Sequence, residues 1–131
     1  MKLVRYAHDE LSSYGVIESG HILHLDGDPM GDCSKGSVVG KLGEVKLLAP
    51  CLPSKIIAIA INFKGIDGFN EKMIEPMVFI KPSSSICGPG DTISNPFPHL
   101  PMWGEAALGV VIQDIKPFST EDEVKKGVLG F

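Results

Sequence analysis

The alternation of hydrophobic and polar positions predicts a β-rich chain with one helix near its end. Short apolar runs bounded by turn-forming residues recur through the first fifty positions, which is typical of a small antiparallel lobe. The strands expected there are residues 2–7, 14–18, 21–25, 38–39 and 44–48. The Ser19-Gly20 pair between two of these runs predicts a hairpin. Residues 26–32 are dense in Asp, Gly and Pro, so they predict a loop.

A second set of apolar runs follows the Pro-flanked segment at residues 49–53. Residues 55–61 are β-branched and apolar on both faces, which predicts a fully buried strand. Residues 76–81 predict another strand, and residues 88–91 predict a tight turn. Residues 95–101 contain three prolines and are excluded from the interior of a sheet.

The run at residues 102–113 leads from this Pro-rich segment into a strand expected at residues 107–113, with Glu105 at its entrance. A carboxylate at such a position is a common part of a metal or acid–base site. Residues 119–123 predict a capping box at the start of a helix, with Val124 and Val128 on one face and Gly130 as its stop. The fold class is therefore α+β and mostly β. A small N-terminal β lobe is expected at residues 1–50, followed by a second region at residues 51–131.

Composition and charge narrow the function classes. The chain has 131 residues, is 44% hydrophobic and 21% charged, and can therefore bury a core. Its net charge is −4 and no basic run occurs, which argues against nucleic acid as a partner. No apolar run reaches the ~20 residues of a membrane helix, and charges interrupt the N-terminus as no signal peptide would. A cytoplasmic protein is expected. The three widely spaced cysteines predict reduced packing thiols rather than a zinc site.

Several segments, taken in order, resemble the N-terminal portion of the fumarylacetoacetate hydrolase family. They are Gly27-Asp28-Pro29 and residues 45–50, 53–56, 61–63, 75–82, 88–91, 105–112 and 128–131. The resemblance implies a β-rich fold whose second region is the first part of a rolled mixed sheet. It also implies a Mg²⁺ or Mn²⁺ site made of carboxylates. The implied activities act on short oxo-acids and include C–C bond hydrolysis, decarboxylation, hydration and isomerisation.

The family pattern also indicates which residues would carry the chemistry, and this chain departs from it. The family holds its metal with a Glu-x-Glu at the start of one strand and a later Asp. Glu105 matches the first Glu, but Ala107 stands at the second, and Gly104 replaces the usual tyrosine. Many members activate water with a His and a Glu, and the matching positions are Ile66 and Phe69.

Glu105 is the candidate metal ligand, although a hard dication wants several oxygen ligands and one carboxylate cannot hold it tightly. The later Asp would fall beyond Phe131. Asp67, Glu71 or Asp91 remain open as additional ligands, and the plain alternative is that Glu105 is a solvent-facing carboxylate.

His99, in the Pro-rich loop near the expected cleft, is the candidate catalytic residue that could replace the missing base. His21 and His24 are three apart in a strand and are expected to point to opposite faces, in surface or turn roles. The candidate substrate-binding residues are Lys81 and Asn62. Lys81 could attract a substrate carboxylate or be an ordinary strand-end lysine.

Two function hypotheses follow. In the family, later strands complete the sheet begun by residues 55–131, so open edges and apolar surface are expected here, covered by a protein partner or by self-association. The leading hypothesis is a catalytically degenerate relative that acts as a structural or regulatory subunit and needs no cofactor. The alternative is a Mg²⁺- or Mn²⁺-dependent hydrolase or decarboxylase of small oxo-acids, in which a partner chain supplies the ligands that Glu105 lacks.

Overall fold

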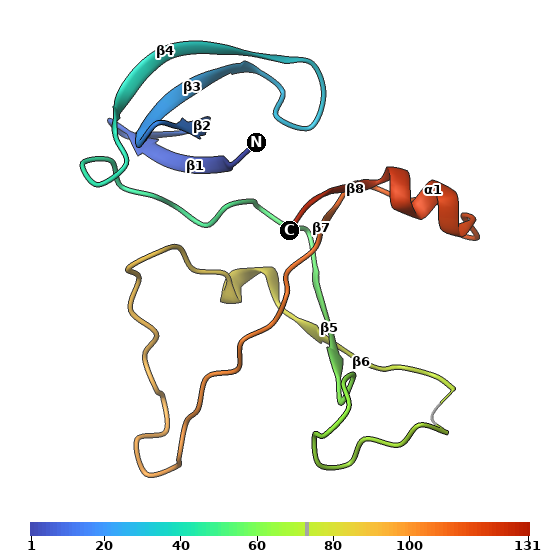
Figure 1. Ribbon diagram of the computed structural model, residues 1–131. Coiled ribbons are helices and arrows are strands. Elements are labelled where there is room, and N and C mark those ends of the chain that lie inside the picture. Colours follow the sequence, from blue (N-terminus) through green and yellow to red (C-terminus); the bar gives the residue numbers. More distant parts are fainter. Residues whose placement is uncertain (73) are drawn as a thin grey trace.

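The computed structural model describes residues 1–72 and 74–131, and these are mostly β-strand with one short α-helix near the C-terminus (Figure 1). The strands form one four-stranded sheet and two separate two-stranded sheets, and every strand pair is antiparallel. The four-stranded sheet has the order β1-β2-β3-β4. Its strands are β1 (Leu3–His8), β2 (Leu11–Glu18), β3 (His21–Gly27) and β4 (Cys33–Lys41).

The first three strands confirm the local predictions. β2 and β3 form the predicted hairpin, with Glu18 opposite His21 and two residues between them. Those two residues, Ser19 and Gly20, have φ values of 47° and 78°. Positive φ at both positions matches the right-handed twist of the strands that a two-residue turn must connect. The predicted loop at residues 26–32 starts slightly later, because β3 runs through Gly27.

The strand predicted at residues 44–48 is wrong in extent. The segment makes a single bridge, between Leu47 and Tyr6, and two backbone hydrogen bonds to β1. A turn in which the Glu44 amide donates to the Lys41 carbonyl occupies its start, and Pro50 lies just beyond its end. Little length remains for a ladder, yet the segment still covers the edge of β1 that β2 leaves open.

Among the residues that the structure describes, all the buried ones lie within the first fifty positions. The hydrophobic core consists of Tyr6, Val16, Ile22, Leu25 and Ala49, each at most 8% exposed. It brings together β1, β2, β3 and the segment that returns to β1. The N-terminal lobe is therefore built around its own small core.

The second region contains β5 (Ile56–Ala60) and β6 (Met77–Lys81), which confirm the positions of the two predicted strands. The predicted full burial of residues 55–61 is wrong, because Ile57 and Ile59 are 56% and 49% exposed. The cause is tertiary: among the described residues, β5 and β6 pair only with each other. Among residues 51–72 and 74–131, none is buried.

A short helical turn, η1 (Ser83–Ser85), follows β6, and the predicted turn at residues 88–91 is confirmed. The Asp91 amide donates to the Gly88 carbonyl at 3.2 Å. This turn lies against the N-terminal lobe, because a Cβ at Gly88 would be 2.7 Å from the backbone nitrogen of Ala49.

The strand predicted at residues 107–113 shrinks to β7 (Val111–Ile112), because its partner β8 (Val128–Gly130) has only three residues. The helix α1 (Glu121–Lys126) begins with the predicted capping box, formed by Thr120 and Glu123. It ends before Val128, which pairs with Ile112 instead, so the predicted stop at Gly130 is wrong. Within residues 1–72 and 74–131, no helix has the length and apolar character that crossing a bilayer requires.

Candidate functional site

Glu105 lies in an exposed segment without regular secondary structure, not at a strand entrance. Its Oε1 accepts a hydrogen bond of 3.2 Å from Nε1 of Trp103, a side chain that is 75% exposed. The strand that was expected to position Glu105 begins only at Val111. The carboxylate is therefore held by a local contact with a neighbouring side chain.

Two of the other carboxylates left open as metal ligands, Glu71 and Asp91, have local partners of their own. Glu71 Oε1 lies 3.2 Å from Nζ of Lys64, and Oδ2 of Asp91 accepts a hydrogen bond of 2.7 Å from the Gly88 amide. Within residues 1–72 and 74–131, no three His, Cys, Asp or Glu side chains lie close enough to share an ion. Mg²⁺ and Mn²⁺ prefer a nearly complete shell of oxygen ligands. The donors that this chain brings together do not fit the metal site implied by the family resemblance.

Lys81 and His99 are exposed and lie in different elements. Lys81 is the last residue of β6, and its Nζ is 5.9 Å from the centroid of the Phe79 ring. His99 lies in the Pro-rich segment, with its ring 6.3 Å from that of Phe97 in an edge-to-face arrangement. Their roles in substrate binding and catalysis remain predictions.

Asn62 follows β5 at a strained point of the backbone. The preceding Ile61 has a φ of 52°, which is costly for a β-branched residue. Asn62 lines a depression of about 250 Å³ between the end of β5 and the start of β6. Phe69, Glu71 and Met77 are also in its wall. Among the described lining residues, Asn62 and Glu71 are the candidate site residues, so this depression does not gather the predicted set.

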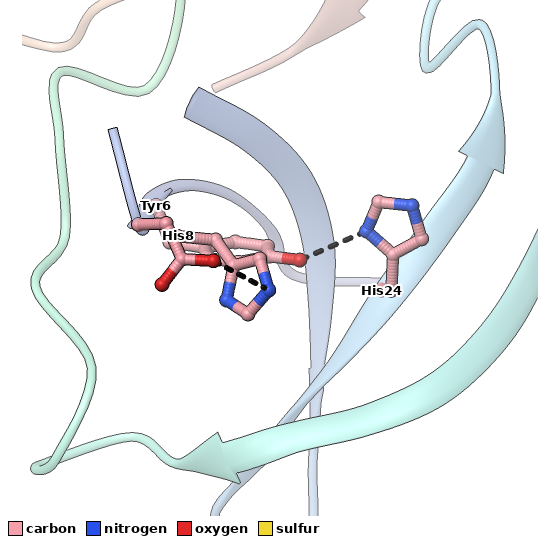
Figure 2. Close-up of polar contacts among 4 residues, drawn as sticks. Tyr6, His8 and His24 are labelled. Atoms are coloured by element: carbon pink, nitrogen blue, oxygen red, sulfur yellow. Dashed lines mark hydrogen bonds and ion pairs between the residues drawn. The ribbon is translucent and has the colours of Figure 1, made fainter. Parts of the chain in front are cut away.

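A polar network in the N-terminal lobe was not predicted (Figure 2). Its centre is Tyr6 on β1, whose hydroxyl lies 2.8 Å from Nδ1 of His24 on β3. On the other side of the imidazole, Nε2 is 3.5 Å from Oδ1 of Asp26. Between β1 and β3 runs β2, where Gly15 leaves room for the Tyr6 ring to reach His24, since a Cβ there would be 3.1 Å from Cε1 of Tyr6.

Burial raises the pKa of Tyr6 above its ordinary value of 10.0, a hydrogen bond with the Ser13 side chain lowers it, and the charge of Asp26 raises it. The phenol is therefore neutral near pH 7, and its hydroxyl shares a hydrogen bond with Nδ1 of His24 whose direction depends on the tautomer of the imidazole. The three side chains form one chain of polar contacts from a buried phenol to an exposed carboxylate.

The other histidines have simpler surroundings. Nδ1 of His21 lies 3.1 Å from the Ser19 carbonyl oxygen, in the turn role that was expected. His8, also drawn in Figure 2, is 3.9 Å from Asp9, and both side chains are exposed. The role expected for His24 was wrong, since its ring contacts buried Tyr6. The signal that was overlooked is the i, i+2 spacing of His24 and Asp26 on a strand, which places both on one face.

Comparisons with known proteins locate the similarity. Residues 1–50 match a family described as Rv2993c-like, N-terminal. The fumarylacetoacetate hydrolase domain-containing protein 2 homolog of Dictyostelium discoideum is 36% identical over 90 residues, which cover 66% of this chain and 29% of that protein. The 2,4-didehydro-3-deoxy-L-rhamnonate hydrolase of Sphingomonas sp. strain SKA58 is 37% identical over 79 residues, which cover 59% of this chain and 28% of that enzyme.

A solved structure shows the same partial match. An uncharacterised protein from Mycobacterium abscessus aligns with a TM-score of 0.53 and 29% identity, over 66% of this chain and 35% of that one. In each comparison the matched segment spans about a third or less of the relative's length. Residues 1–50 thus match an Rv2993c-like N-terminal domain, and the chain shares partial homology with fumarylacetoacetate hydrolase family proteins over its N-terminal part.

Proposed function

We propose that this chain is a catalytically degenerate relative of the fumarylacetoacetate hydrolase family that acts as a structural or regulatory subunit. In this function, residues 51–131 are covered by a second polypeptide, either another copy of the chain or a larger partner. The N-terminal lobe has its own core, whereas the second region depends on the assembly.

The observation that carries the proposal is the surface area. The chain exposes 10724 Å² for a mass of 14.0 kDa. A compact monomer of that mass exposes about 6700 Å². The difference, about 4000 Å², is several times the ~800 Å² that each partner contributes to an interface of standard size. An assembly that covers it resembles an obligate complex.

The character of that surface supports the same conclusion. Large apolar side chains are exposed along the whole second region: Ile57, Val78 and Ile80 on the hairpin are 56%, 53% and 71% exposed. Further along, Trp103 and Leu108 are 75% and 77% exposed. Contiguous apolar surface larger than a few hundred Å² marks an interaction site.

The predicted loss of catalysis rests on the departures from the family pattern. Ala107 replaces the second metal-binding Glu, while Ile66 and Phe69 stand at the positions of the water-activating pair. Neither the alanine nor the isoleucine or phenylalanine can bind a metal or transfer a proton. Glu105 alone keeps its side-chain type.

Two measurements test the proposal. Native mass spectrometry and small-angle scattering of the full chain should show an oligomer or a hetero-complex, and a compact, stable monomer would overturn the subunit function. Calorimetric titration with Mg²⁺ or Mn²⁺ should show no specific binding, with Glu105→Ala indistinguishable from wild type and Glu10→Ala as the matched surface control. Micromolar binding that Glu105→Ala abolishes, and Glu10→Ala does not, would overturn the loss of the metal site.

The hydrolase alternative is kept for one observation, the 37% identity with 2,4-didehydro-3-deoxy-L-rhamnonate hydrolase. In this alternative Glu105 is a metal ligand, and a partner chain supplies the others. It requires that metal binding appear only in the complex. The same titration, repeated on the assembled complex with and without Glu105→Ala, separates it from the subunit function.

A further inference from the structure

We propose that β6 pairs with β6 of a second copy of this chain, so that two β5–β6 hairpins form one four-stranded antiparallel sheet about a two-fold axis. Such pairing presupposes the function proposed above, since it is one contact by which a second polypeptide covers residues 51–131. It assigns that contact to a particular strand, register and partner.

The outer edge of β6 is unpaired in the part of the chain that the structure describes. The sheet consists of β5 and β6 alone (Figure 1). All five residues from Met77 to Lys81 are exposed. An edge strand with unpaired N–H and C=O groups is a template for a strand of another chain. Pro76 and Pro82 flank β6 and lack N–H donors, so they confine any added pairing to these five residues.

The two-fold axis fixes the register. An antiparallel pair of identical five-residue strands is symmetric about the middle residue, so Phe79 lies opposite Phe79 of the second copy. Val78 then lies opposite Ile80 of the second copy, and Ile80 lies opposite Val78 of that copy. These side chains are now 44%, 53% and 71% exposed. Cross-strand aromatic and β-branched pairs are among those that stabilise antiparallel strands, so the register is favourable along its length.

The charges at the two ends of β6 favour a second copy in this orientation. Glu75 lies just before the strand and Lys81 is its last residue, so the strand carries a negative and a positive end. In the two-fold register, Lys81 lies opposite Met77 of the second copy. Glu75 of that copy precedes Met77 by two residues, in the bend that leads into the strand, so opposite charges of the two copies meet at each end of the paired strands. A parallel pairing would instead bring Lys81 against Lys81.

The Lys81 side chain already extends toward the centre of the strand, with Nζ 5.9 Å from the Phe79 ring. Residues 77, 79 and 81 share one face by alternation. The ammonium group is thus on the face of Met77 and Phe79, at the end of the strand where Glu75 of the second copy would lie. An isologous interface of this kind needs no complementary protein, because the strand is complementary to itself.

Sedimentation velocity of the full chain over a range of concentrations tests the charge pairing. Lys81→Glu and Glu75→Lys should each raise the dimer dissociation constant about fivefold, since each change reverses one member of both symmetric pairs. The double variant, which exchanges the two charges, should return to the wild-type value. Lys116→Glu, an exposed charge reversal elsewhere, should leave it unchanged. A dimer insensitive to both single changes, or a double variant no better than either, would overturn the pairing.

Cross-linking tests the register independently of stability. In a background where Cys33, Cys51 and Cys87 are serine, Phe79→Cys should give an intermolecular disulfide dimer under mild oxidation, because the two residues meet on the axis. Ile57→Cys on β5 should give none. Equal cross-linking at both positions would overturn the register. An oligomer that ignores every β6 change would refute β6 pairing and leave the subunit function standing, whereas a compact monomer would refute both.

Discussion

Replacement of Gly15 by alanine should destabilise the N-terminal lobe. Among the glycines of the lobe that have an ordinary φ, Gly15 should be the one at which an added methyl group costs the most stability. Gly15 lies on β2, paired with Val4 on β1 and His24 on β3. An added Cβ would lie 2.6 Å from the carbonyl oxygen of Leu23 and 2.8 Å from Cγ2 of Ile22. The first of these atoms is backbone and belongs to the β2–β3 pairing, so it cannot move aside without disturbing the sheet.

The size of the effect follows from two losses. Adding a methyl group to a tightly packed position costs about 1–3 kcal/mol. The Tyr6 ring must also shift, which weakens its hydrogen bond with His24 by about 1 kcal/mol. A total of about 2–4 kcal/mol corresponds to a fall of roughly thirtyfold to several-hundredfold in the hydrogen-exchange protection of β2 and β3.

Hydrogen-exchange mass spectrometry on the full chain measures this change in peptides that cover residues 11–27. Gly43→Ala is the matched control, because an added Cβ there meets no atom within 4 Å and the backbone φ is ordinary. Its protection should equal that of wild type or rise slightly. A loss below about threefold for Gly15→Ala, or an equal loss in both variants, would refute the packing of Tyr6 across β2.

Two further predictions concern titrating groups. Burial raises the pKa of Tyr6, so the folded lobe holds the phenol proton more tightly than the unfolded chain does. The resulting stabilisation is complete below pH 10.0 and is lost as the pH rises through the folded-state pKa. Urea unfolding between pH 8 and 11 should therefore show a steeper alkaline loss for wild type than for Tyr6→Phe, and equal slopes would contradict it. Hydrogen bonds from the Thr120 amide and hydroxyl lower the pKa of the Glu123 carboxyl group. The stabilisation of α1 by this capping carboxylate is therefore complete above the ordinary carboxyl pKa of 4.5 and is lost as the pH falls through the folded-state value. The α1 carbon shifts should move toward coil on acidification, and Thr120→Ala should cost the helix about 1 kcal/mol while Thr120→Ser retains the cap.

The first three strands of the N-terminal lobe were predictable because their local signals agree, whereas β4 extends well beyond the expected residues 38–39. Residues 2–7 alternate as a half-buried strand does, and the Ser19-Gly20 pair supplies the positive φ that a two-residue hairpin needs. The capping box of α1 was equally predictable from the sequence, since it depends only on Thr120 and on Glu123 three residues later. Elements that are decided by neighbours in sequence were therefore found at nearly their observed positions.

Burial and strand length could not be obtained in the same way, because both depend on partners distant in sequence. The apolar run at residues 55–61 shows that the strand has apolar side chains on both faces. Ile57 is nevertheless half exposed, because no layer of the described residues packs on it. The strand expected at residues 107–113 has only two residues, Val111 and Ile112, because its partner β8 is itself short.

The Tyr6 network was missed for a related reason. It joins β1 and β3 across Gly15, and a glycine in a strand pattern does not say which side chain will cross it. The candidate site had the same weakness. Lys81 ends β6, whereas His99 and Glu105 lie in the irregular segment between η1 and β7, and none of the three lines the depression at Asn62.

The contrast between the two halves of the chain links these results. Tyr6, Val16, Ile22 and Leu25 are enclosed by strands that follow one another directly, so local pairing is sufficient to bury them. The aliphatic residues of β5 and β6 have the same chemical character but only one strand each as a neighbour. A two-stranded hairpin is marginal in water until a further strand or layer covers it. Extension of the sheet through β6 supplies this further strand. It pairs the free N–H and C=O groups along the edge of β6, and it places Phe79, Val78 and Ile80 against apolar partners at the same time.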